Sequence, residues 1–268
     1  MKGFPAAVLL VERGKPKGKM MTPQMLTSPQ GREIAYHQSK GAGPGVVFLG
    51  GFRSDMTGTK ALYLQDWAVR TGRGFLRFDY SGHGRSGGRF EDGTIGDWFE
   101  DALAVLALTA GPQVLVGSSM GGWIALLLAR AVPERIAGLV GIAAAPDFTE
   151  DSMWAGFSAA ERAELLGKGR VEQASEYSEP YVITWRLIED GRLRLVLRTP
   201  LNLPFPVRLL QGTADVDVPQ AVALRLLAHA TGQDIRLTLV KGADHRFSSV
   251  ECLGMIGAAV EDVLACVR

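Results

Sequence analysis

The sequence is poor in cysteine and histidine and carries almost no net charge. Its 268 residues include two cysteines and four histidines, and 29 basic side chains are balanced by 28 acidic ones. Such a balance gives no electrostatic reason to bind nucleic acid or an anionic membrane surface. No apolar run approaches the roughly 20 residues that a membrane-spanning helix needs. We therefore expect neither nucleic acid nor stable membrane insertion among its interactions.

The scarcity of cysteine also bears on the compartment. Cys252 and Cys266 lie in a segment with helical periodicity, which would hold them roughly 21 Å apart, too far for a disulfide. Free thiols are typical of a reducing compartment, so we expect a cytoplasmic protein. The apolar residues 4–11 are few and no small-residue cleavage site follows them, so we expect no signal peptide. Met20 and Met21 leave open a later natural start, with residues 1–19 as an overhang.

What the sequence does contain is a regular alternation of structure signals. From residue 45 onward, short β-branched apolar runs alternate with longer amphipathic stretches, which is typical of a mostly parallel sheet covered by helices on both faces. Residues 33–39 predict an antiparallel strand before them. The other predicted strands are residues 45–51, 74–80, 113–119, 136–145, 206–212 and 234–242.

Residues 148–204 interrupt this alternation. They show helical patterns without an obvious strand, one of them running from near Ser178 to Gly191. The insertion is too long for an ordinary loop, so we predict a helical lid, with extra helical cover away from the substrate as the alternative. The predicted organisation is an N-terminal extension (1–29), a core (30–147 and 205–268) and the lid (148–204).

Two serines match the pattern G-x-S-x-G, and their context distinguishes them. Ser119 follows a predicted strand and precedes a strongly apolar helix, whereas Ser86 lies within a continuous glycine-rich loop. A nucleophilic serine needs a sharp strand-to-helix turn, which lifts its hydroxyl into a cleft and aims the first helical amides at the developing charge. We therefore predict Ser119 as the nucleophile and interpret the neighbouring Ser118 as structural.

A serine nucleophile needs a base to take its proton and an acid to orient that base. His245 directly follows the last predicted strand, which places it at the same sheet edge as Ser119. Three aspartates follow strands at that edge. We favour Asp215 as the acid, and Asp147 and Asp217 stay open as alternatives that could instead cap the following segments. The chain order Ser, Asp, His is that of α/β-hydrolases.

Acyl transfer also needs two hydrogen-bond donors for the oxyanion. The first is expected to be the amide of Met120, which follows the nucleophile. The second is the amide of Phe52, in the loop after strand 45–51, where Gly50 and Gly51 let the backbone approach a substrate closely. A merely flexible turn is the alternative interpretation of this loop. Neither a metal nor a cofactor is predicted.

The lid region offers two further groups of candidates. Its aromatic residues could bind the acyl group of a substrate, although helical spacing more often indicates packing against a core; they are Trp154, Phe157, Tyr181 and Trp185. Its basic residues could bind an anionic leaving group, although a solvated charge cluster is the simpler interpretation; they are Arg192, Arg194 and Arg198.

Taken together, several stretches resemble the α/β-hydrolase superfamily over roughly residues 30–267. They are SDMTGTKA, LRFDYSGHGRSGG, GPQVLVGSSMGGW, EYSEPY, PVRLLQGTADVDVP and GADHR. Within the superfamily, the chain is similar to the group of α/β-hydrolase domain-containing protein ten. This group contains a mitochondrial palmitoyl-protein thioesterase that is also described as a mycophenolic acid acyl-glucuronide esterase. The resemblance implies the same triad, Ser119, Asp215 and His245, and thioesters and activated esters as substrates. Where many α/β-hydrolases have His-Gly, this chain has Gly50-Gly51, and no transit peptide is recognisable.

We therefore expect a serine hydrolase that cleaves carboxylic esters or thioesters through an acyl-enzyme. The partner would be a small-molecule ester or thioester, or an acylated protein, and the resemblance adds depalmitoylation and acyl-glucuronide cleavage as reactions. A non-catalytic ligand-binding module on the same fold and a carbon-carbon bond hydrolase are the alternatives.

Overall fold

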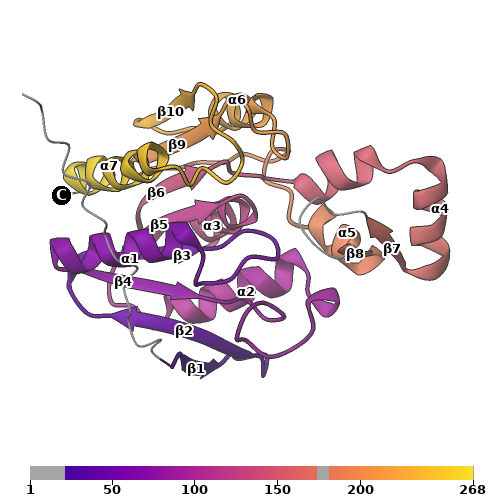
Figure 1. Ribbon diagram of the computed structural model, residues 1–268, viewed down its shortest axis with the longest axis horizontal. Helices are drawn as coiled ribbons and strands as arrows, with labels where there is room; N and C mark the ends of the chain where they lie inside the picture. The colour runs from indigo at the N-terminus through magenta and orange to yellow at the C-terminus, as the bar shows by residue number, and fades with distance from the viewer. Residues whose placement is uncertain (1–21, 174–180, 268) are drawn as a thin grey trace, which may run out of the picture.

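The computed structural model describes residues 22–173 and 181–267 (Figure 1). Its centre is a sheet in which β2 runs antiparallel to both β1 and β4, and every other neighbouring pair is parallel. From edge to edge the strands are β1 (Gln24–Thr27), β2 (Glu33–Ser39), β4 (Arg73–Phe78), β3 (Ala42–Leu49), β5 (Gln113–Ser118), β6 (Ile136–Ile142), β9 (Val207–Gly212) and β10 (Ile235–Val240).

This sheet confirms the predicted fold class, and each strand predicted from the apolar runs is present. The sequence missed β1, whose QMLT segment has no clear alternation of apolar and polar residues. β1 lies in the stretch assigned to the N-terminal extension, yet it pairs with β2 and forms one edge of the sheet.

Helices cover both faces of the sheet, and each face has its own buried apolar cluster. α1 (Thr59–Thr71) and α7 (Val250–Cys266) pack on one face. α2 (Ile95–Leu106), α3 (Met120–Ala131) and α6 (Gln220–His229) pack on the other, and two short 3₁₀ turns, Phe90–Asp92 and Pro133–Arg135, lie in loops. No helix among the described residues is long and apolar enough to cross a bilayer.

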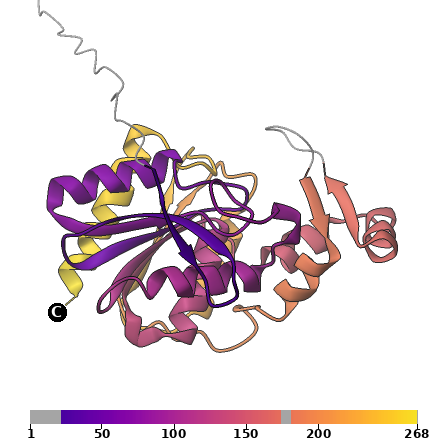
Figure 2. The ribbon, with the colours of Figure 1, turned by 90° about the horizontal axis from the view of Figure 1, so that it is seen from below.

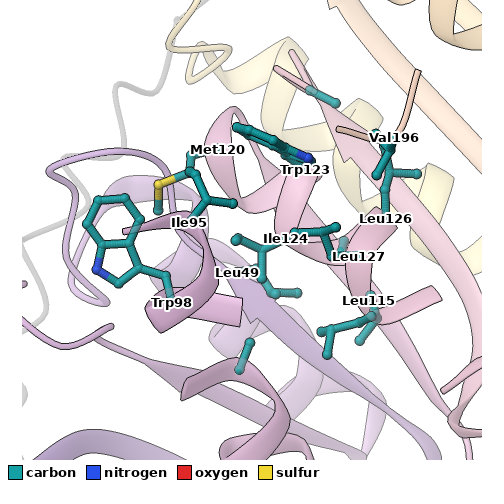
Figure 3. Close-up of a cluster of buried hydrophobic side chains, with 14 of the residues drawn as sticks. Leu49, Ile95, Trp98, Leu115, Met120, Trp123, Ile124, Leu126, Leu127 and Val196 are labelled. Atoms are coloured by element: carbon teal, nitrogen blue, oxygen red, sulfur yellow. The ribbon is translucent and has the colours of Figure 1, made fainter. Parts of the chain in front are cut away.

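Helix α3 is the most deeply buried of these helices, as its all-round apolar sequence predicts. Every residue from Met120 to Ala129 is buried. Figure 3 shows Met120 and Trp123 of α3 in one buried cluster with Trp98 of α2 and Leu115 of β5. Because α3 is held on all sides, the turn that precedes it has a fixed position.

Of residues 148–204 the structure describes 148–173 and 181–204, whose helices and strands project from one end of the core in both ribbon views (Figures 1 and 2). We call them the insertion, because their role as a lid stays a prediction. Besides helices, the insertion contains an antiparallel strand pair that the sequence analysis did not predict. Its elements are a π-helix (Thr149–Trp154), α4 (Ala159–Lys168), β7 (Arg170–Gln173), β8 (Tyr181–Thr184) and α5 (Trp185–Arg192).

The helix predicted to start near Ser178 begins instead at Trp185. The segment before it, YVIT, is rich in β-branched residues and pairs with β7 as strand β8. The Thr184 hydroxyl then accepts the Leu187 amide and so caps the start of α5. Ser178 itself lies outside the described residues.

Candidate active site

Ser119 lies on the tight turn between β5 and α3. Its backbone has φ 53° and ψ −118°, a conformation that residues other than glycine rarely adopt. The flanking glycines are required by close packing. A Cβ on Gly117 would lie 2.4 Å from the Gly121 carbonyl oxygen, and a Cβ on Gly121 would lie 2.1 Å from the Leu49 carbonyl oxygen. The turn can therefore form only with glycines at both positions.

The structure brings the three predicted triad residues into one hydrogen-bonded series. Ser119 Oγ lies 3.1 Å from His245 Nε2, and His245 Nδ1 lies 2.9 Å from Asp215 Oδ2. Because an ionised carboxylate can only accept, the Nδ1 proton points to Asp215, and the lone pair of Nε2 faces the serine hydroxyl. An imidazole placed in this way can take the hydroxyl proton.

Asp215 is a buried carboxylate with its oxygens fully engaged. Oδ1 accepts the amides of Asp217 (3.0 Å) and Val218 (2.8 Å), and Oδ2 accepts Gln211 Nε2 (3.0 Å) as well as His245. Burial by itself raises the pKa of Asp215, but the hydrogen bonds from His245 and the Val218 amide outweigh it, so the net pKa lies below the ordinary value. The group is therefore ionised at neutral pH.

The two alternative acids have other surroundings. Asp147 is fully buried and accepts the amides of Val196 (2.8 Å) and Leu197 (3.0 Å) and the guanidinium of Arg198 (2.7 Å). It thereby joins the start of the insertion to its end. Asp217 is exposed and contributes its own amide to Asp215. Of the three candidates, Asp215 is the one hydrogen-bonded to His245.

The predicted oxyanion loop, which we define as residues 50–56, passes directly beside Ser119. A Cβ on Gly51 would lie 3.4 Å from the Cβ of Ser119. The Gly51 carbonyl accepts both the amide (3.1 Å) and the hydroxyl (2.8 Å) of Ser54. Because this carbonyl and the Phe52 N–H belong to one peptide group and point in opposite directions, fixing the carbonyl also fixes the N–H. Met120 is the first residue of α3, where amides have no partner within the helix.

A cavity of about 630 Å³ opens at Ser119 and His245. Its apolar wall includes Phe52 from the oxyanion loop, together with Phe148 and Met153 from the start of the insertion. Basic side chains also line it, namely those of Arg53, Lys60 and Arg246. Lys60 and Arg246 were not predicted, because they are 186 positions apart in sequence and only the fold brings them together.

Three of the four aromatic residues predicted to bind the acyl group do not line this cavity. They are Trp154, Phe157 and Trp185, which pack against one another with ring centroids 5.5 Å (Trp154 to Trp185) and 6.5 Å (Trp154 to Phe157) apart. The guanidinium of Arg192 lies 4.7 Å from the centroid of the Trp154 ring. These residues form a small core of the insertion, which their helical spacing also allowed. The side chain of Tyr181 lies outside the described part of the structure.

The three arginines considered for an anionic leaving group are paired with carboxylates of the protein. The pairs are Arg192 with Glu150, Arg194 with Asp190, and Arg198 with Asp147 and Asp151. These pairs favour the interpretation of the three arginines as a charge cluster over that of a binding site for an anionic leaving group.

One group of potential metal ligands occurs in the described part of the chain, and it overlaps the triad. The donor atoms of Asp215, Asp217 and His245 lie within 4.8 Å of one another. Two of the three are already engaged in the hydrogen bonds described above, and we assign no metal to them.

Comparison with known proteins bears on this arrangement. The family described as Serine aminopeptidase, S33 (Hydrolase_4), matches residues 45–185. Mitochondrial palmitoyl-protein thioesterase ABHD10 of Homo sapiens is 34% identical over 242 residues, which make up 89% of this chain and 79% of that protein.

Two solved structures are similar over almost their whole length. A protein described as a hydrolase from Agrobacterium vitis S4 is 45% identical with a TM-score of 0.87, and the match covers 92% of this chain and 98% of that one. Mouse α/β hydrolase domain-containing protein 10 is 31% identical with a TM-score of 0.85, and the match covers 92% and 100%.

The fold and these relatives define the class of protein as an α/β-hydrolase. Within that class, the chain belongs to the Hydrolase_4 family and to the ABHD10 group of proteins. The names of the relatives support an ester or thioester hydrolase activity. The catalytic roles of Ser119, His245 and Asp215, and the oxyanion roles of Phe52 and Met120, stay predictions.

Proposed function

We propose that the protein is a serine hydrolase that cleaves carboxylic esters or thioesters through a covalent acyl-enzyme. The observation that carries this proposal is the hydrogen-bonded series from Ser119 through His245 to the buried Asp215. The series opens on a cavity large enough for a small-molecule ester.

In the proposed reaction, His245 Nε2 takes the proton of Ser119, whose Oγ attacks the acyl carbonyl carbon. The amides of Phe52 and Met120 donate to the oxyanion, and Asp215 stabilises the imidazolium. His245 then gives its proton to the departing alcohol or thiol. A water molecule that loses a proton to the same imidazole attacks the acyl-enzyme, releases the acid and restores Ser119.

The lining of the cavity supports an acyl group with substantial apolar surface. Phe52, Phe148 and Met153 offer a contact surface for a hydrocarbon chain. A thiolate leaves without strong acid assistance, so thioesters suit this site at least as well as oxyesters. The palmitoyl-protein thioesterase name of the curated relatives favours a long-chain thioester on a protein.

Lys60 supports a leaving group that carries negative charge. Lys60 lines the cavity and its ammonium donates to the Arg246 carbonyl, and within the described ranges it forms no salt bridge. Burial lowers the pKa of Lys60, and the charges of Asp244 and Arg246 act on it in opposite directions. An anionic group of a substrate beside the ammonium would favour its charged form. An acyl glucuronide, whose leaving group has a carboxylate, fits this chemistry.

Exchange of Lys60 tests this preference. With Lys60→Met, kcat/KM for an acyl glucuronide should fall by about tenfold while that for an uncharged p-nitrophenyl ester stays within twofold, and Lys60→Arg should retain the preference. Equal losses with both substrates would remove the charge argument.

Fluorophosphonate labelling tests the central proposal. The wild-type protein and Ser118→Ala should be labelled and should hydrolyse p-nitrophenyl esters and an acyl thioester, whereas Ser119→Ala should do neither. Labelling and turnover by Ser119→Ala would show that the nucleophile is misassigned. Saturable ligand binding without serine-dependent turnover would instead favour a non-catalytic binding module, and turnover of carbon-carbon substrates alone would favour the other alternative.

The compartment stays a proposal of the same kind. Cys252 and Cys266 are free thiols, which is in keeping with the reducing, cytoplasmic location that we propose. The curated relatives, in contrast, are named mitochondrial. Fractionation of the source cells would decide between the two.

A further inference from the structure

The glycine-rich loop that follows β4 contains a buried histidine that the proposed reaction does not use. His83 is 4% exposed, and its Nε2 lies 3.2 Å from the backbone nitrogen of Arg53 in the oxyanion loop. We propose that His83 is a positioning residue, whose neutral imidazole accepts the Arg53 N–H and so holds the neighbouring Phe52 amide at the nucleophile. This inference rests on the proposed roles of Ser119 and Phe52.

The hydrogen bonds of His83 define its tautomer. Nδ1 lies 3.1 Å from the Ser81 carbonyl oxygen, which can only accept, so Nδ1 carries the proton. Nε2 is then unprotonated and accepts from Arg53. The Ser81 carbonyl also accepts Trp98 Nε1 at 3.1 Å, which fixes its own direction. A doubly protonated imidazole would instead direct an N–H at the N–H of Arg53.

The surroundings of His83 keep it both in place and neutral. Its ring contacts those of Tyr80, Phe90 and Trp98 at centroid distances between 5.1 and 5.7 Å. Burial, with a further contribution from the charge of Arg53, lowers its pKa to about 4, although the Ser81 carbonyl opposes the shift. The imidazole therefore stays an acceptor throughout the range in which esterases are assayed.

The oxyanion loop needs such an anchor because its backbone is strained. Arg53 has φ 56°, a conformation unfavourable for a residue with a side chain. The loop is anchored again at its far end, where the Met56 amide donates to Asp79 Oδ1 at 2.6 Å. Both anchors belong to the stretch just after β4, so this stretch holds the loop at two points around Phe52.

The ring of Phe52 extends the same contact. It packs edge-on against Phe90 at 4.8 Å and against Trp98 at 5.8 Å, the two rings that also hold His83. The backbone and the side chain of this region therefore depend on one cluster. A small shift of His83 would move the Phe52 amide relative to Ser119.

Two substitutions at His83 distinguish the role of the Nε2 acceptor from that of the ring's volume. In His83→Gln the longer side chain can place an amide oxygen near the position of Nε2, whereas in His83→Asn the amide reaches only the position of Nδ1. Loss of one oxyanion donor costs about 10²- to 10³-fold in kcat, and a donor that is displaced but present should cost less. We expect His83→Asn to lose roughly 10- to 100-fold in kcat and His83→Gln to retain most of it.

Inhibitors distinguish positioning from general damage. A boronic acid that mimics the tetrahedral intermediate should lose affinity for His83→Asn in proportion to kcat, while the inhibition constant of the carboxylic acid product stays within twofold. Equal losses in the two variants, or unchanged rates in both, would overturn the proposal.

A spectroscopic measurement decides the case even if both variants fold poorly. In the wild-type protein with ¹⁵N-labelled histidine, His83 should show the neutral Nδ1–H tautomer from pH 8 down to pH 5. An Nε2–H tautomer, or titration near the ordinary value, would overturn the inference. Failure of the proposed function has a separate signature, which is full turnover by Ser119→Ala.

Discussion

The two matches to G-x-S-x-G place their serines in different surroundings. The hydroxyl of Ser119 meets a side chain, that of His245, on a strained turn at the mouth of a cavity. The hydroxyl of Ser86 meets backbone on both sides, because it donates to the Asp79 carbonyl (2.6 Å) and accepts the Ala35 amide (2.8 Å). One hydroxyl is thus available for chemistry, and the other holds a loop against β2.

The last glycines of the two motifs differ, whereas the first ones, Gly117 and Gly84, are both closely packed. Gly121 is needed because the chain beside it, at Leu49, leaves no space for a Cβ. Gly88 has φ +89° and a Cβ there would approach the Gly82 nitrogen no closer than 3.6 Å, so it serves the direction of a turn. The short motif alone therefore does not distinguish the two serines. The strand before Ser119 and the helix after it do.

The largest expected effect concerns kcat and Asp215, the proposed acid in the hydrogen-bonded series that begins at Ser119. Asp215→Asn should lower kcat by about 10⁴-fold, because the amide cannot hold the required tautomer of His245 or stabilise its imidazolium. Asp217→Asn, two residues further along the same loop and exposed, is the matched control and should stay within about threefold of the wild type. Initial rates with a p-nitrophenyl ester provide the measurement. Comparable losses in both variants would mean that Asp215 cannot be distinguished from Asp217 as the acid.

The next largest effect concerns the glycines. Gly121→Ala should lower the free energy of unfolding by about 4 kcal/mol or prevent soluble expression, because its Cβ would overlap the Leu49 carbonyl oxygen. Gly88→Ala should cost only about 1 kcal/mol, from its positive φ alone. Urea denaturation measures both values. A well-tolerated Gly121→Ala would mean that the close packing around the turn is not required.

The features that the sequence predicted correctly are local. The strands, the turn at Ser119 and the placement of Asp215 and His245 follow from apolar runs and from the rule that parallel strands end at one edge. The features it missed depend on contacts between distant segments. Lys60 donates to the Arg246 carbonyl at the cavity wall, and His83 accepts the Arg53 amide from a neighbouring loop. No periodicity marks such pairs.

The insertion shows the same limit. Its aromatic spacing was compatible with either a substrate surface or a small core, and Trp154, Phe157 and Trp185 form the latter. Phe148 and Met153 line the cavity because they follow the carboxyl end of β6. Their position after a predicted strand would have indicated this, whereas the prediction relied on aromatic content.

The third prediction concerns the pH dependence of stability, through His83. Its pKa is about 4 in the folded protein and near 6.5 when unfolded, so the unfolded chain binds more protons between these values. The contribution of neutral His83 to the free energy of unfolding is therefore complete above pH 6.5. It is lost as the pH falls, and the loss reaches roughly 3 kcal/mol at pH 4. Urea denaturation of wild type and His83→Gln at pH 7 and pH 4.5 measures it. The two proteins should differ in their pH dependence, and parallel curves would mean that His83 can be protonated in place.

The smallest effect expected concerns the second serine. Ser86→Ala removes the acceptor of the Ala35 N–H, in a residue that is fully buried, and the donor to the Asp79 carbonyl. The free energy of unfolding should fall by about 2 kcal/mol, the cost of leaving a buried backbone group without a partner. Because Ser86 has no part in the proposed reaction, kcat/KM of the folded enzyme should stay within about twofold. Ser86→Thr keeps the hydroxyl and should recover part of the stability. A loss of turnover without a loss of stability would contradict the contrast between the two serines, since it would place Ser86 in the chemistry rather than in the frame that supports it.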